Sequence, residues 1–398
     1  MIVFDHCQVL PNMMITDGIR PASPSKRLVF LDVLRGFMLV GITLGHFGDT
    51  FVWLVWQPLG YFSNAEGFIL LSGTVFGLVY ARIYHRSPHE MTEKAVRRAG
   101  LIYLNHLGLL VFVAAFTWLT YGWSTQWHSH ALYLDLAPVK GFLLGILMLY
   151  QPPLLDILPM YALFVLVGPL IIRQLMAGRW RVVLAVSFVV WVIFAHLLLG
   201  GTWRETLAQR VGLGFPYQTG EFDPLVWQLL FFSGLILGHR MFAHPGALRP
   251  KPVLVVLSLM LALYFFALRH DYLPFPGFWH ASWVDRHDLG LIRMLNIAAL
   301  VYLFWTLVVV SRNVVWSRGM IMVRDFFAVL GRHSLPVFTA HVVLIYLTIP
   351  VQQAGSDPIR YAVGISLIVF LYLMARVFDG RAARLRREKA GLSRPLGH

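Results

Sequence analysis

Three ionisable residues, Asp32, Arg35 and His46, lie in one hydrophobic run at residues 28–47. An ionisable side chain at the centre of a lone membrane helix costs roughly 2.5–3.5 kcal/mol, so such groups usually face a protein interior or a wet cavity. In a helix, Asp32 and Arg35 can pair. His46 returns to the face of Arg35 within roughly 20°, but roughly 16 Å farther along. The stripe predicts either a polar site inside a membrane protein, or an anchoring ion pair and a histidine buried between helices.

Glu66 is the second candidate, because it begins the run at 61–81 in the same outer half of the membrane as His46. A histidine oriented by a carboxylate can act as a general base that deprotonates a hydroxyl near neutral pH. A polar pair that only joins two helices is the structural alternative. The spacing alone leaves both interpretations open.

Two further side chains could support chemistry in the apolar runs. Ser72 can hydrogen-bond across helices or serve as a nucleophile, whereas Gly73 and Gly77 beside it form a small-residue packing face. His341 lies deep in a later run, where a histidine is a functional candidate by default. A hydrogen bond between helices is the alternative for His341.

Basic and aromatic residues mark the two ends of the predicted helices. Lys94, Arg97 and Arg98 precede the run at 99–121 and could bind phosphate groups of a cytosolic donor, or only fix the topology. The outer loops are rich in tryptophan, which suits an interfacial belt or a platform on which sugar rings stack. The candidate acceptor-binding residues are Trp53, Trp56, Trp123, Trp127 and Asp156. The outer histidines and aspartates match no metal-ligand spacing, so we expect no metal site.

Composition excludes an ordinary soluble domain. The 398 residues are 58% hydrophobic and 13% charged, which indicates a protein that crosses the lipid bilayer several times. The net charge of +14 could suggest a nucleic-acid partner, but the basic residues cluster between apolar runs, as the positive-inside rule requires. We therefore expect no nucleic-acid partner. Cys7 is the only cysteine, so no intrachain disulfide can form.

Charge also decides which apolar runs span the membrane. The run at 138–150 is short and precedes Pro152 and Pro153, so it is expected to be re-entrant or non-spanning. If it spanned, the basic cluster at 173–181 would move outside and every later loop would invert. The fold class predicted is therefore an all-α polytopic membrane protein with about ten transmembrane helices and both termini in the cytoplasm. The expected organisation is a disordered tail at 1–27, a transmembrane domain at 28–378 and a basic tail at 379–398.

Several motifs in order resemble a known family. Residues 31–36 together with His46 resemble the first-helix signature of the membrane acyltransferase type 3 superfamily, and segments 64–73, 156–161, 227–234 and 330–341 resemble its OpgC branch. The superfamily's Arg-x-x-Arg corresponds here to residues 94–97, which read Lys-Ala-Val-Arg. Asn64 stands where the branch has an aspartate.

The resemblance implies a bacterial inner-membrane enzyme that moves an acyl group, typically succinyl, from cytosolic acyl-CoA to hydroxyls of periplasmic glucan. It implies no permanently bound cofactor, with acyl-CoA as co-substrate, and it makes His46 the catalytic residue. In the expected mechanism His46 deprotonates a glucan hydroxyl, with Glu66 as orienter, and Arg35 is paired with Asp32. An acyl-histidine intermediate stays open.

Two other function classes remain open from the residues alone. A transporter or flippase for a sugar, an anion or a lipid-linked oligosaccharide would also use a polar cavity with intramembrane charges. A structural partner in a glucan-synthesis complex would need no chemistry at His46. The sequence also leaves open whether the chain forms a homo-oligomer.

Overall fold

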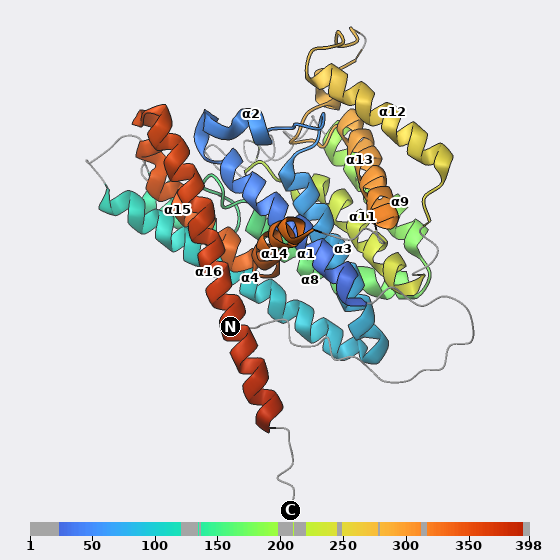
Figure 1. The fold of residues 1–398 in the computed structure, drawn as a ribbon, viewed down its shortest axis with the longest axis horizontal. Helices are drawn as coiled ribbons and strands as arrows, with labels where there is room; N and C mark the ends of the chain where they lie inside the picture. The colour runs from blue at the N-terminus through green and yellow to red at the C-terminus, as the bar shows by residue number, and fades with distance from the viewer. Residues whose placement is uncertain are drawn as a thin grey trace, which may run out of the picture.

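The computed structural model describes residues 24–120, 134, 137–197, 210, 220–244, 249–277, 279–311 and 317–392, and these residues are helices, turns and loops without strands. Figure 1 shows the helices gathered into one bundle, with α12 at one edge and the C-terminal half of α16 extending beyond it. The elements are α1 Pro24–Gly45, η1 Gly48–Phe51, α2 Val52–Val55, α3 Asn64–Arg86, α4 Pro88–Leu119, α7 Pro138–Ile146, α8 Ile157–Met176, α9 Trp180–Val192, η2 Ile193–Leu197, α11 Pro224–Ala243, α12 Pro252–Arg269, η3 Ala281–Trp283, α13 Leu291–Val310, α14 Arg318–Arg332, α15 Ser334–Ala354 and α16 Asp357–Leu392.

Within the described residues, nine helical segments are long and apolar enough to cross a membrane. They are α3, α4, α8, α9 with η2, α11, α12, α13, α15 and α16 up to Ala382. Helix α1 is not among them, and it carries the charged residues Asp32 and Arg35. With α1 as the first span, these segments match the ten spans predicted from the sequence. The protein is an all-α, multi-pass membrane protein.

Helices α3 and α11 run parallel and touch backbone to backbone. A Cβ at Gly73 would lie 2.1 Å from the carbonyl oxygen of Phe231, and a Cβ at Gly77 would lie 2.1 Å from that of Leu235. The contacts therefore advance in the same order along α3, from Gly73 to Gly77, and along α11, from Phe231 to Leu235. The two helices cross the membrane in the same direction. Three spans between them, α4, α8 and α9, give this parallel orientation. A further crossing at residues 138–150 would instead make α3 and α11 antiparallel.

Helix α7 is too short to span. Its nine residues extend about 14 Å, against a hydrocarbon core of about 30 Å. Its C-terminal end packs on the middle of α4, where the Tyr103 hydroxyl donates to the carbonyl oxygen of Ile146 at 2.7 Å and His106 Nε2 lies 3.2 Å from that of Gly145. Because the contact lies at the middle of α4, this packing favours a re-entrant segment over one on the membrane surface.

The predicted run at 325–349 is two helices rather than one. Pro336 cannot donate to the carbonyl of Arg332, so a helix that ran through both would lose a bond and clash. The chain instead breaks at His333, between α14 and α15. Helix α14 lies antiparallel to α1, with Gly331 against the backbone of Asp32. Helix α15 runs parallel to α1, a placement that brings its side chains to those of the first helix.

The first and last helices meet at one side of the bundle. Gly331 contacts the backbone of Asp32 in α1, and the adjacent Arg332 donates to Asp379 of α16 at 3.0 Å. Two chain ends on one side require an even number of crossings, as ten spans provide. Helix α16 continues to Leu392, so the first part of the predicted C-terminal tail is helical, whereas residues 1–23 lie outside the described residues.

We predict that Gly234→Ala lowers the stability of the bundle. Its Cβ would lie 2.1 Å from the carbonyl oxygen of Leu70, so α3 and α11 must separate, at a cost of about 1–3 kcal/mol. Gly108→Ala on α4 is the control, because a Cβ there has no neighbour within 4 Å. Thermal unfolding of the two purified variants in detergent measures the difference. Equal melting temperatures would contradict the close contact.

Candidate functional site

His46 and His341 form a pair where α1 ends against the middle of α15. His46 Nδ1 lies 3.2 Å from His341 Nε2, and the two rings are stacked with centroids 5.4 Å apart. His341 is buried, with 1% of its surface exposed, whereas His46 is partly exposed. The second nitrogen of His341, Nδ1, lies 2.7 Å from the carbonyl oxygen of Phe338. The three groups form a continuous hydrogen-bonded chain, which we call the histidine relay.

The carbonyl at one end of the histidine relay determines where the protons lie. A carbonyl oxygen only accepts, so His341 Nδ1 must carry a hydrogen and donate it. In the neutral ring His341 Nε2 is then an acceptor, and His46 Nδ1 must donate to it. This leaves the lone pair of His46 Nε2 unprotonated. No hydrogen bond to this atom occurs among the described residues, so it can accept a proton from another molecule.

Glu66 does not contact His46 through any hydrogen bond in the described part of the chain. Its side chain is fully buried in α3, where one oxygen accepts from the backbone amide of Ser63 at 2.5 Å and the other pairs with Arg293 at 2.7 Å. Arg293 also donates to the carbonyl oxygens of Val284 and Asp285, in the loop before α13. The expected orienting contact must therefore be corrected, since His341 occupies that position. A catalytic role for Glu66 stays a prediction that no contact supports.

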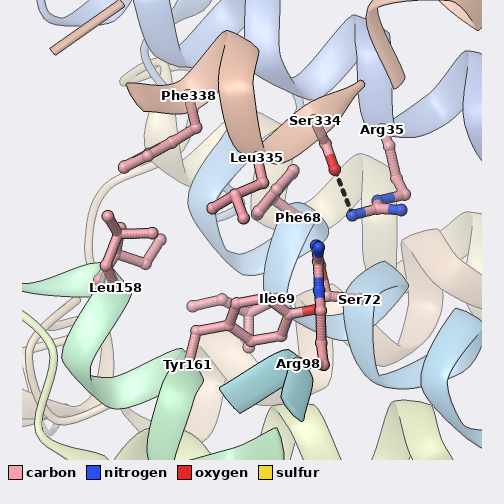
Figure 2. A pocket seen from close by; sticks show the side chains of 11 residues that line it. Arg35, Phe68, Ile69, Ser72, Arg98, Leu158, Tyr161, Ser334, Leu335 and Phe338 are labelled. Atoms are coloured by element: carbon pink, nitrogen blue, oxygen red, sulfur yellow. Dashed lines mark hydrogen bonds between the residues drawn. The ribbon is translucent and has the colours of Figure 1, made fainter. Parts of the chain in front are cut away.

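A narrow pocket lies on the inner side of the histidine relay, with about 390 Å³ of space when the open solvent at its mouth is included. Figure 2 shows Arg35, Ser334, Ser72 and Arg98 gathered on one side of it, and Phe338 with Leu158 on the other. The remaining lining residues are Phe68, Ile69, Ile157, Tyr161 and Leu335. The ring of Phe338 packs edge-on against His341, with centroids 4.7 Å apart. The pocket is thus cationic at one end, and at the other end the ring of Phe338 lies between it and the relay.

Arg35 reaches this pocket without the partner that its spacing suggested. No ion pair within 4 Å joins Asp32 and Arg35 in the described residues. Instead, Arg35 Nη2 donates to the Ser334 hydroxyl at 2.5 Å, and the guanidinium lies 5.7 Å from the ring centroid of Phe68. The pairing predicted for the first helix is therefore wrong, because Arg35 serves as a link from α1 to α15.

Of the three predicted donor-binding residues, only Arg98 lines the pocket. Lys94 forms an ion pair with Glu90 at 2.7 Å on the surface of α4, and Arg97 is exposed. Arg98 lies about one turn beyond Lys94 on the same face of α4, and at that deeper position its side chain lines the pocket. The structure therefore separates the basic cluster into one inward residue and two outward ones.

The outer side presents aromatic and charged residues from distant loops. Trp53 is 72% exposed, and the guanidinium of Arg286 lies 5.3 Å from the ring centroid of Trp56. Arg286 also pairs with Glu221 at 2.5 Å. Neither charged residue of this pair belongs to a motif that marks it in the sequence. Trp123 and Trp127 lie outside the described residues.

Asp156 supports this surface from below. Its side chain is buried, and its Oδ2 accepts from the backbone amide of Glu221 at 2.7 Å. Burial raises the pKa of Asp156 to about 6, although the hydrogen bond from Glu221 opposes that shift. Asp156 therefore positions the segment that carries Glu221. Its role in binding an acceptor directly stays a prediction.

The family model described as OpgC protein matches residues 27–382. The chain belongs to the OpgC family. No curated protein and no solved structure gives a significant match. Membership in the OpgC family indicates a membrane acyltransferase that acts in glucan modification, and it agrees with the resemblance of the sequence motifs.

We predict that Glu66→Gln destabilises this OpgC-family protein, because it leaves the buried Arg293 without its counter-charge. Breaking a buried pair on one side costs about 3–5 kcal/mol. The double variant Glu66→Gln/Arg293→Met removes both charges and should recover part of that loss. Thermal unfolding in detergent measures all three proteins. If Glu66→Gln has the same melting temperature as the wild type, the Glu66–Arg293 pair does not hold α3 to α13.

We predict that the stability of the protein depends on pH through Asp156. Because the pKa of Asp156 in the folded protein, about 6, exceeds its ordinary value of 3.8, folding is favoured when the residue is protonated. Its contribution is fully present below about pH 4 and is lost as the pH rises through 6, with an upper limit of about 3 kcal/mol. Asp156→Asn cannot ionise. Its melting temperature relative to wild type should therefore rise between pH 4 and pH 7, and a constant difference would refute the shift.

Proposed function

We propose that the protein is an O-acyltransferase that moves an acyl group, succinyl in the simplest case, from cytosolic acyl-CoA to a hydroxyl of periplasmic glucan. The observation that carries the proposal is the histidine relay, whose proton arrangement leaves His46 Nε2 as an available base. Family membership supplies the reaction class and the acceptor class. The succinyl group, the CoA donor, the inner membrane and the role of His46 are parts of the proposal.

The proposed reaction is a single proton-coupled displacement. His46 Nε2 takes the proton of a glucan hydroxyl as the oxygen attacks the thioester carbon. The carbon–sulfur bond breaks, and the imidazolium returns the proton to the departing sulfur, which gives an ester and the free CoA thiol. His341 Nε2 accepts from His46 Nδ1 throughout, and this bond strengthens when His46 becomes charged.

The surroundings of His46 support a reaction in which glucan and acyl-CoA approach it from opposite sides of the membrane. His46 is partly exposed and lies two residues before η1, and the exposed Trp53 in α2 and Trp56 at its end could stack on sugar rings. The pocket on the inner side ends at Phe338, which contacts His341. A thioester that entered along this pocket would meet the relay at that ring. Lys94, which is partly exposed, and Arg97, which is exposed, are suited to the nucleotide part of CoA outside the bundle.

The test is transfer by the His46→Ala variant. Losing a general base should lower the rate by roughly 10²–10⁴-fold, because only weaker bases then remain. His89→Ala is the control, since His89 is an exposed histidine at the start of α4. The measurement is the mass and the anionic charge of periplasmic glucans from cells that express each protein at equal level.

Equal modification of the glucans from cells with wild-type protein and with His46→Ala would contradict the role of His46 as general base. A protein that never transfers from acyl-CoA, yet moves a sugar or an anion across the bilayer, would support the transporter alternative instead.

A further inference from the structure

Two buried polar groups in the inner pocket have no hydrogen-bond partner in the described part of the chain. They are Nε of Arg35, a residue with 6% of its surface exposed, and the hydroxyl of Ser72, which is 2% exposed. A buried donor without a partner costs free energy, more so on a charged group. Both residues line the same pocket, and Figure 2 shows their side chains on the side where Arg98 also enters. The site therefore has unused donors around a position suited to an anion.

We propose that this end of the pocket binds the phosphate of a phosphopantetheine arm, with Arg35, Arg98 and Ser72 as its ligands. The inference rests on the proposed function and specifies where the donor sits. Guanidinium groups bind phosphate oxygens through two parallel hydrogen bonds, and the Arg35 fork has Nε available for one of them. The Ser72 hydroxyl supplies a further donor.

Length decides between phosphate and the other anion that an acyl donor can carry. Arg35 and His46 are eleven residues apart, which separates them by about 16 Å along α1. About thirteen bonds join the phosphorus of phosphopantetheine to its sulfur, and an extended chain advances about 1.1–1.2 Å per bond, which gives ~15 Å. The terminal carboxylate of a succinyl group lies only about 4 Å from its thioester carbon. A carboxylate at Arg35 would hold the thioester roughly 12 Å short of His46.

The rest of the pocket suits such an arm. Apart from the cationic groups and Ser72, its walls include the apolar side chains of Phe68, Ile69, Leu158, Leu335 and Phe338. These match the methyl and methylene groups that follow the phosphate. Since Phe338 packs against His341, an arm anchored at Arg35 would place its sulfur beside the histidine relay.

The experiment compares two probes, pantetheine 4′-phosphate and pantetheine, by calorimetry on the full-length protein in detergent. Wild type should bind the phosphate probe at least about tenfold more tightly. Ser72→Ala and Arg98→Gln should each weaken only the phosphate probe, by about tenfold, the effect of losing one hydrogen bond to a charged group. Arg86→Gln is the charge-matched control, because Arg86 is exposed at the end of α3. The unpartnered hydroxyl of Ser72 can be removed with little effect on folding, which thermal unfolding verifies.

Equal binding of the two probes, or equal losses for both in the variants, would overturn the proposal. Displacement of the phosphate probe by succinate would assign the site to an acyl carboxylate. Displacement by phosphatidylglycerol micelles would assign it to lipid, and either result would also overturn the proposal. Binding is measured without transfer. A protein that binds the phosphate probe as predicted but never acylates glucan would therefore refute the proposed function alone.

Discussion

The histidine relay depends on one hydrogen bond, from His341 Nδ1 to the carbonyl oxygen of Phe338. A carbonyl accepts and never donates, so this bond fixes the tautomer of a buried ring that would otherwise have two choices. The constraint passes through His341 Nε2 to His46. A neutral histidine whose other nitrogen already donates is a base at the nitrogen that remains. No carboxylate is needed at the relay for this result, which distinguishes it from a histidine oriented by an acid.

The packing of three helices, α1, α14 and α15, holds this relay in place. Helix α15 must run beside α1 for His341 to reach His46, and the bond from Arg35 to Ser334 joins the same two helices nearer the inner side. Helix α14 touches α1 through glycine, with a Cβ at Gly36 placed 1.9 Å from the carbonyl oxygen of Phe327. Larger residues at such positions would separate the backbones, and the two rings would lose their contact distance.

Hydropathy and charge predicted the class of fold, because span length and basic loops are imposed by the bilayer itself. They could not predict the break at His333, where the apolar pattern continues and only Pro336 marks the change. Helical spacing identified Arg35 and His46 as residues of one face. It could not name their partners, since Ser334 and His341 are about 300 residues away in the chain.

Glu66 is a second residue whose partner the sequence could not predict. Its position at the outer start of α3 suggested a partner for His46, but Arg293, 227 residues later, takes the carboxylate. A buried carboxylate needs a cationic partner close to it. Which cation lies close depends on how the helices pack, and a single sequence does not reveal that packing. Arg98 lines the pocket, and its predicted role in donor binding stays a prediction, whereas the lining of the pocket by Arg35 and Ser72 became evident only from the structure.

The tautomer of His46 is the most direct test of the relay. Nitrogen-15 NMR of the protein with labelled histidine distinguishes a protonated ring nitrogen from a bare one, and a His46→Gln sample assigns the signals. At neutral pH the account predicts a protonated Nδ1 and a bare Nε2 for both His46 and His341. A hydrogen on Nε2 of neutral His46 would contradict it, because the atom assigned as the base would then have no lone pair to offer.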